Sequence, residues 1–186
     1  MNWLKRCCLH FKTICVHKWW VFYYSRYLGI PFRGFFHDFS KFSPVEFFES
    51  ARFYTGVSSP INEAKAANGI SYAWQHHKGR NPHHYEYWTD KYDTGTVALK
   101  MPFKYVLELV ADYMAAGRTY NSAGFTYERE YEWWQTHKDE KFMHPETKRL
   151  VSAIFDLIKQ DGLSFGDFST KNKIKHDLME KEFKDY

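Results

Sequence analysis

Cysteine is scarce in this sequence. The chain has 186 residues and three cysteines, Cys7, Cys8 and Cys15, all near its start. Their odd number and their clustering do not fit a disulfide framework, which is typical of secreted proteins. The cysteine content therefore predicts a cytoplasmic protein in a reducing compartment.

Long hydrophobic runs are missing as well. The first thirty residues are rich in aromatic side chains, but polar and basic residues interrupt them: Lys5, Arg6, Lys12, His17, Lys18 and Arg26. A membrane-spanning helix needs about 20 consecutive apolar residues, and a signal peptide needs an uninterrupted apolar segment before its cleavage site. We therefore expect no membrane span. A partly buried helix is favoured over peripheral membrane contact through Trp19 and Trp20.

A strong charge of either sign is also absent. The formal net charge is +4, which favours anionic ligands slightly and is too small to predict a stable nucleic-acid partner. Hydrophobic residues make up 44% of the chain, and aromatic residues 20%, which argues against disorder. A chain of this length can form one domain with a substantial core.

Strand-type alternation, internal repeats and long linkers are not found, whereas helix signals recur along the chain. The sequence predicts an all-α fold, a single irregular helical bundle over residues 1–186. Its core covers about 2–160, and a peripheral C-terminal helix covers about 169–186. Residues 89–101 are expected to form a loop. Helices are expected over 2–28, in a short segment ending near 37–38, over 44–54, from 60, over 70–78, from 82, over 102–120, over 126–137 and over 145–161.

Two of these helices carry most of the structural argument. The helix from Pro102 has apolar residues around most of its circumference, which predicts a central position. The helix from Pro82, capped by Asn81, would place His83 and His84 in its first turn.

The stretch Phe35-Phe36-His37-Asp38-Phe39-Ser40-Lys41-Phe42-Ser43-Pro44 combines polar and aromatic residues unusually closely. An imidazole lies beside a carboxylate, with a lysine three residues after the aspartate and four phenylalanines around them. Polar groups in apolar surroundings cost free energy unless they are paired or bind a metal. This stretch therefore indicates a functional site.

Further potential metal ligands are spread along the chain. The candidates are His17, His37, Asp38, His77, His83, His84 and Asp112. This set exceeds a single four-ligand site, so it predicts one or two divalent ions, with Asp38 as a bridging carboxylate in the second case. Mn, Fe, Zn, Mg and Co all remain open. Since adjacent helical residues point about 100° apart, only one of His76 and His77 should face the site, and we favour His77.

The order of these residues resembles the HD-domain superfamily of metal-dependent phosphohydrolases, whose pattern is H…HD…D. More narrowly, the chain resembles a family of small HD-like proteins with the motifs HDxSKFSPxEF, HxxxNPHHxEYW and MPxKYVxExxxDxxxAG, here over 37–47, 77–88 and 101–117. The resemblance covers roughly residues 17–150. It matches His17 to the isolated histidine, His37 and Asp38 to the doublet, and Asp112 to the closing carboxylate. The central histidines lie where two-metal members have additional ligands, but at a shorter interval.

Lys41 and Arg80 are predicted to offset substrate charge beside a catalytic Asp38. The alternative for Lys41 is an ion pair with Glu46 or Glu49, and for Arg80 a solvated loop position. Glu108 is expected to pair with Lys104, one helical turn away. An aromatic run, Tyr85, Tyr87 and Trp88, favours a core cluster over base stacking.

The resemblance implies a phosphohydrolase that acts on a nucleotide, a cyclic nucleotide or another small phosphoester through metal-activated water. One alternative is a non-catalytic protein that binds and sequesters such a ligand. Another is a di-iron oxygenase on an HD-type scaffold. The sequence does not determine the oligomeric state.

Overall fold

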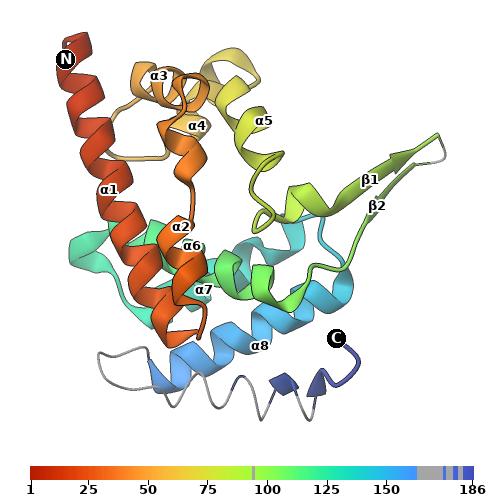
Figure 1. The fold of residues 1–186 in the computed structure, drawn as a ribbon. Helices are drawn as coiled ribbons and strands as arrows, with labels where there is room; N and C mark the ends of the chain where they lie inside the picture. Colours follow the sequence, from red (N-terminus) through yellow and green to blue (C-terminus); the bar gives the residue numbers. More distant parts are fainter. Residues whose placement is uncertain (94, 163–173, 175–177, 180–181) are drawn as a thin grey trace.

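A computed structural model of the chain describes all residues except 94, 163–173, 175–177 and 180–181. The described part is an all-α bundle with one small hairpin, which confirms the predicted fold class (Figure 1). Its α-helices are α1 (Trp3–Tyr27), α2 (Pro31–Phe36), α3 (Pro44–Arg52), α4 (Pro60–Asn68), α5 (Tyr72–Lys78), α6 (Phe103–Tyr120), α7 (Tyr127–His137) and α8 (Pro145–Asp161). Short 3₁₀ helices are η1 (Phe39–Phe42), η2 (Tyr85–Trp88), η3 (Ser122–Gly124) and η4 (Lys138–Glu140).

Local capping explains where several of these helices begin. Ser71 Oγ accepts a hydrogen bond from the Trp74 amide at 3.1 Å, and Thr126 Oγ1 accepts one from the Arg129 amide at 3.1 Å. Proline occupies the first turn of α2, α3, α4 and α8, where its missing amide hydrogen costs nothing. The expected helix starts near 44, 126 and 145 are therefore confirmed.

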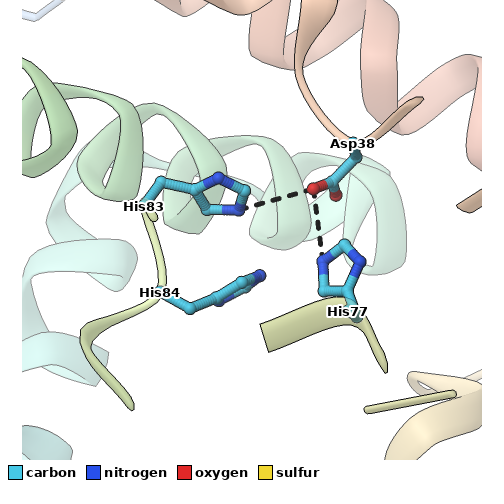
Figure 2. A group of neighbouring side chains, drawn as sticks. All are labelled: Asp38, His77, His83 and His84. Carbon is cyan, nitrogen blue, oxygen red and sulfur yellow. Dashed lines mark ion pairs between the residues drawn. The ribbon is translucent and has the colours of Figure 1, made fainter. Parts of the chain in front are cut away.

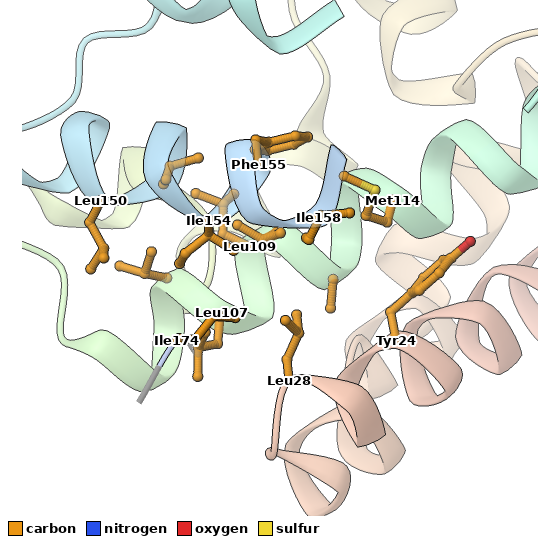
Figure 3. Close-up of a cluster of buried hydrophobic side chains, with 14 of the residues drawn as sticks. Tyr24, Leu28, Leu107, Leu109, Met114, Leu150, Ile154, Phe155, Ile158 and Ile174 are labelled. Atoms are coloured by element: carbon orange, nitrogen blue, oxygen red, sulfur yellow. The ribbon is translucent and has the colours of Figure 1, made fainter. Parts of the chain in front are cut away.

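The hydrophobic core lies where α6 crosses between α1 and α8. Figure 3 shows Tyr24 of α1 and Leu28, the residue after its last turn, on one side of α6, and the buried stripe of α8 on the other. That stripe recurs at helical spacing, at Leu150, Ile154 and Ile158, and is fully buried. Most of the residues of α6 between Val106 and Ala115 are buried, so its predicted central position is confirmed.

An aromatic stack joins α7 to this core. The Trp134 indole lies 5.5 Å from the Phe155 ring at an interplanar angle of 4°, and its Nε1 donates to Ser152 Oγ at 2.9 Å. Both rings are almost completely buried. α7 therefore packs on α8.

A close approach between α1 and α2 fixes the segment that leads to His37. A Cβ atom at Gly34 would lie 2.4 Å from Ser25 Cβ and 3.1 Å from Phe22 Cα, so only glycine fits there. Lys18 Nζ donates to the carbonyl oxygens of Phe35 and His37 at the end of α2. These contacts hold the end of α2 against the middle of α1.

The local structure differs from the expectations at the hairpin and at the turn before it. The predicted loop over 89–101 contains an antiparallel hairpin, β1 (Thr89–Tyr92) and β2 (Gly95–Ala98), which projects from the helical body (Figure 1). The predicted helix from Pro82 is wrong: residues 81–84 form a turn and η2 follows. Most of the expected C-terminal helix over 169–186 lies outside the described residues. Among the described residues, no helix combines the length and the hydrophobicity that crossing a bilayer requires.

Candidate metal centre

Five segments bring the predicted ligands to one buried place. His17 comes from the middle of α1, His37 follows the last turn of α2, and His77 lies on α5. His83 and His84 lie in the turn before η2, while Glu108 and Asp112 lie one turn apart on α6. Asp38 has a left-handed backbone, with φ of 54°, and is the one described non-glycine residue with positive φ. Such a conformation is costly for a residue other than glycine and is often retained at functional sites.

Asp38 is the point on which the histidines converge. His37 Nε2 lies 3.0 Å from Asp38 Oδ2, and His17 Nε2 lies 3.9 Å from the same oxygen. Asp112 Oδ1 closes this side, 3.0 Å from His17 Nε2 and 3.5 Å from His37 Nε2. One ligand atom from each of these four residues falls within 4.8 Å of all the others.

A second group of four shares Asp38 from the opposite side (Figure 2). Asp38 Oδ1 lies 3.2 Å from His77 Nε2 and 3.4 Å from His83 Nε2. His84 completes this group, and its ring lies 4.8 Å from the His77 ring and 4.1 Å from the His83 ring, measured between centroids. The two oxygens of one carboxylate thus serve two groups of histidines.

The potential ligand atoms in this cluster are buried and face one another at short distances. Within the described residues, apart from ion-pair contacts with one another and of Asp38 Oδ2 with Lys41, no hydrogen-bond partner is found for these atoms: Nε2 of His17, His37, His77, His83 and His84, and both carboxylate oxygens of Asp38. Buried polar atoms without partners are rare, because each costs free energy. Imidazole nitrogens and carboxylate oxygens are the ligands that divalent transition metals prefer, so the residues fit a pair of metal ions.

Glu108 orients two of these histidines through their other ring nitrogen. Its Oε1 lies 3.1 Å from His37 Nδ1 and 3.4 Å from His83 Nδ1. Arg33 holds the other oxygen, Oε2, at 2.6 Å from Nη2 and 2.7 Å from Nε. The carboxylate accepts the Nδ1 hydrogen, so Nε2 is left free to bind a metal, as is usual for metal-bound histidine. The expected ion pair of Glu108 with Lys104 is therefore wrong.

Glu46 has the same role for the third histidine. Its Oε2 lies 2.7 Å from His77 Nδ1, and its Oε1 lies 2.6 Å from His76 Nδ1. Ser40 Oγ donates to Glu46 Oε2 at 3.1 Å. His77 therefore turns its Nε2 toward Asp38, whereas His76 is not part of either group of potential ligands. This is the orientation predicted for the adjacent pair.

The protonation states of the cluster follow from burial and from mutual charges. Burial raises the pKa of Asp38, but the charges of His37, Lys41 and His77 outweigh burial and hold this pKa well below its ordinary value. Burial and the neighbouring His83 lower the pKa of His84 well below its ordinary value. The ionised carboxylate of Asp38 and the neutral imidazole of His84 are the forms that bind metals. Burial lowers the pKa of His37 and His77, but Asp38 and the other nearby carboxylates outweigh burial and raise it, so a metal bound there would displace a proton.

Lys41 and Arg80 reach the centre from different sides. Lys41 Nζ pairs with Asp38 Oδ2 at 2.6 Å, and its side chain lines a cavity of 170 Å³ that also contacts His17, His84 and Asp112. Arg80 is exposed and lines a separate cavity of 320 Å³, together with Arg33, Asp38 and His83. The alternative pairing of Lys41 with Glu46 or Glu49 is wrong, because those carboxylates bind other groups: His76, His77 and Ser40 for Glu46, and Ser71 and the Ala73 amide for Glu49.

Sequence reasoning undervalued Glu46, Glu108 and Arg33. The sequence indicated Glu46 only as an alternative partner of Lys41, and Glu108 only as a partner of Lys104. One signal was present in the sequence, since Glu108 lies one helical turn before Asp112 and therefore on the same face of α6. Arg33 gave no such signal, because it lies 75 residues away from its partner.

Comparison with known proteins assigns the chain to a family without assigning a function. Residues 8–157 match the family of unknown function DUF5662, and the chain belongs to that family. The matched segment contains every residue of both groups of potential ligands. No curated protein matches the chain, and no solved structure matches it.

Proposed function

We propose that this protein is a metal-dependent phosphohydrolase of the HD type, with two divalent ions bridged by Asp38. The observation that supports this proposal is the convergence of buried imidazole nitrogens and carboxylate oxygens on Asp38. His17, His37, Asp38 and Asp112 would hold one ion. Asp38, His77, His83 and His84 would hold the other.

The chemistry of such a pair suits phosphoester hydrolysis. Two divalent ions lower the pKa of water toward neutrality and offset charge on phosphoryl oxygens. The order H…HD…D and the lysine of the HDxxK motif support hydrolysis over other metal chemistry by resemblance. By the same resemblance, the substrate is a small phosphorylated molecule such as a nucleotide or a cyclic nucleotide.

The chain supplies cations for an anionic substrate on both sides of the centre. Lys41 borders the smaller cavity, and Arg33 and Arg80 border the larger one. Burial lowers the pKa of Lys41, but the Asp38 and Asp112 carboxylates outweigh burial and raise it, so the ammonium group stays charged. A fixed positive charge beside a reacting phosphoryl group stabilises the charge that develops there. We therefore assign to Lys41 the role of offsetting the negative charge of the substrate.

We place the protein in the cytoplasm. Its three cysteines are free, and Cys8 and Cys15 are exposed, which suits a reducing compartment.

The test is turnover of a phosphomonoester and a phosphodiester with a chromogenic leaving group, with manganese added. Wild type is compared with Asp38→Asn and with Asp90→Asn, a control that changes an exposed aspartate of the hairpin. We expect Asp38→Asn alone to lose activity, by a factor of about 100 or more, since it removes the bridge between the ions. Equal activity in all three would overturn the proposal. Ligand that binds and is returned intact would favour sequestration, and an oxygen-dependent product with an iron absorption band would favour an oxygenase.

A further inference from the structure

Aromatic rings of α1, α2 and η1 form one continuous and largely exposed surface, in which Phe22 is half-buried. The rings follow one another with centroid distances between 5.1 and 6.3 Å, in the order Trp19, Phe22, Phe35, Phe36, Phe39, Phe42 and Phe11. We call this set the aromatic band. α1 and α2 lie side by side in the fold, so residues far apart in the sequence join in the band (Figure 1).

The band is exposed to an extent unusual for apolar residues. Trp19 is 60% exposed, Phe36 63% and Phe35 56%. Scattered apolar residues on a surface need no explanation, but a contiguous exposed apolar patch marks an interaction site. The band therefore has the character of an interaction surface.

The helical spacing of α1 shows that this face is separate from its core face. Leu4, Cys8, Phe11, Cys15 and Trp19 are all exposed, and their spacing of three or four residues places them on one side of the helix. A different side carries His10, Ile14, His17, Val21 and Tyr24, which are buried in the molecule. Because α1 thus has two apolar sides, the packing of the bundle covers only one of them.

The segment that carries the band has charge of almost one sign. Residues 1–45 contain seven lysines and arginines, but Asp38 is their one acidic residue, and it is buried in the metal centre. Lys5, Lys12 and Arg26 are exposed on α1 itself. The whole chain has a formal net charge of only +4, so the remainder of the chain is net acidic. The positive charge is concentrated where the exposed aromatic residues lie.

We propose that the aromatic band docks on a membrane surface that contains anionic lipids. Aromatic side chains insert at the boundary between headgroups and acyl chains, and lysine and arginine beside them attract anionic headgroups. The combination of exposed tryptophan and phenylalanine with cations and without exposed acids fits that boundary. Such binding is peripheral, and it requires no spanning helix.

A second copy of the chain fits this face less well. In a two-fold dimer the same surface is buried on both subunits, so the cations of residues 1–45 would face one another. Like charges in an interface oppose association. An anionic bilayer offers the apolar layer and the opposite charge together.

The experiment is co-sedimentation of the 186-residue protein with phosphatidylcholine vesicles, with and without phosphatidylserine. About 30 mol% phosphatidylserine gives the vesicles an anionic surface potential. We expect binding only to the anionic vesicles, and weaker binding at high salt because salt screens charge. Trp19→Ser combined with Phe36→Ser should reduce binding about tenfold or more. The matched control is Phe142→Ser, which changes a phenylalanine that is 52% exposed outside the band.

A second pair of variants tests charge alone and leaves the band intact. Lys5→Glu with Lys12→Glu should weaken binding by about fivefold or more per lysine. Lys91→Glu with Lys104→Glu, two exposed lysines elsewhere, should change it little. Thermal melting shows whether the variants fold. If the aromatic pair unfolds, the lysine pair carries the test.

Three results would overturn the proposal. The first is no preference of wild type for anionic vesicles. The second is equal loss of binding in the band variants and in their controls. The third is a dimer in solution that the band variants dissociate, without binding to vesicles, which would assign the face to a second copy. None of these results depends on turnover, so the docking surface and the proposed hydrolysis are tested separately.

Discussion

Replacing Glu108 by glutamine tests how the centre is held together. Glu108 contacts Nδ1 of His37, from one group of potential ligands, and Nδ1 of His83, from the other. It also pairs with Arg33 at 2.6 Å. A single change from carboxylate to amide therefore removes a charged acceptor from both groups without altering the size of the side chain.

The expected effect is large for a residue outside the two groups of potential ligands that share Asp38. Replacing the hydrogen-bond partner of a metal-bound histidine typically costs about 10–100-fold in metal affinity, or about 1.4–2.7 kcal/mol. Since Glu108 contacts a histidine of each group, Glu108→Gln should lower the affinity for both ions. Glu46 contacts His77 of one group only, so Glu46→Gln should weaken one ion and leave the other near its wild-type affinity.

The assay is competitive titration of Mn²⁺ or Zn²⁺ against a chromophoric chelator, with Glu132→Gln as the control on an exposed glutamate of α7. The discriminating result is the pattern: two ions weakened by Glu108→Gln, one by Glu46→Gln and none by Glu132→Gln. If Glu108→Gln binds both ions with affinities within about twofold of wild type, the loss is far smaller than expected, and the reasoning is refuted.

Three further predictions concern charge, packing and pH. Lys41→Met should bind both ions as tightly as wild type or more tightly, because it removes a cation 2.6 Å from Asp38. Its turnover should fall about tenfold or more. Loss of metal in the titration would contradict this role of Lys41. Gly34→Ala should lower the free energy of unfolding, measured in urea, by about 1–3 kcal/mol, because its Cβ would lie 2.4 Å from Ser25 Cβ. A second change, Ser25→Gly, should restore part of the loss. An unchanged stability of Gly34→Ala would contradict the close approach. Burial raises the pKa of Glu130 from 4.5 to about 7, so the folded state favours the protonated form. This stabilisation is complete below pH 4.5 and is lost as pH rises through about 7, so the free energy of unfolding should fall by about 1–3 kcal/mol over that interval, relative to Glu130→Gln; parallel urea profiles for the two proteins at pH 5 and pH 8 would exclude it.

The helices could be predicted because their signals are local. Ser43 before Pro44 and Thr126 before Tyr127 begin helices through contacts within a few residues, and the apolar spacing of α8 shows its buried face directly. The hairpin could not be predicted in this way. Its strands have four residues each, and β2 is exposed along most of its length, so no alternation of buried and exposed residues marks it.

The turn that carries His83 and His84 shows how distant contacts override a local signal. Asn81 was expected to cap a helix, but its side-chain amide donates to the His77 carbonyl at 2.8 Å and to Ser40 Oγ at 2.9 Å. The carbonyl of Pro82 accepts from Trp88 Nε1 at 2.6 Å. These bonds hold the turn open, so both histidines point toward Asp38.

The candidate ligands were identified because residue type limits the chemistry. Buried histidine and aspartate in one chain favour metal binding wherever they meet, and the structure brings all seven predicted ligands together. The sequence did not indicate that Glu108 orients these ligands. Its contacts with the histidines and with Arg33 form only when distant segments come together in the fold. Occupancy by metal and the reaction stay predictions.

The most direct test of the central claim is the metal content of the protein. Elemental analysis after loading with manganese or zinc and desalting should find about two ions per chain, the number expected for a bridged pair. Asp38 belongs to both groups of ligands and Asp112 to one. Asp38→Asn should therefore lose both ions and Asp112→Asn one. Wild-type protein without bound metal, or Asp38→Asn with as much metal as wild type, would contradict the account.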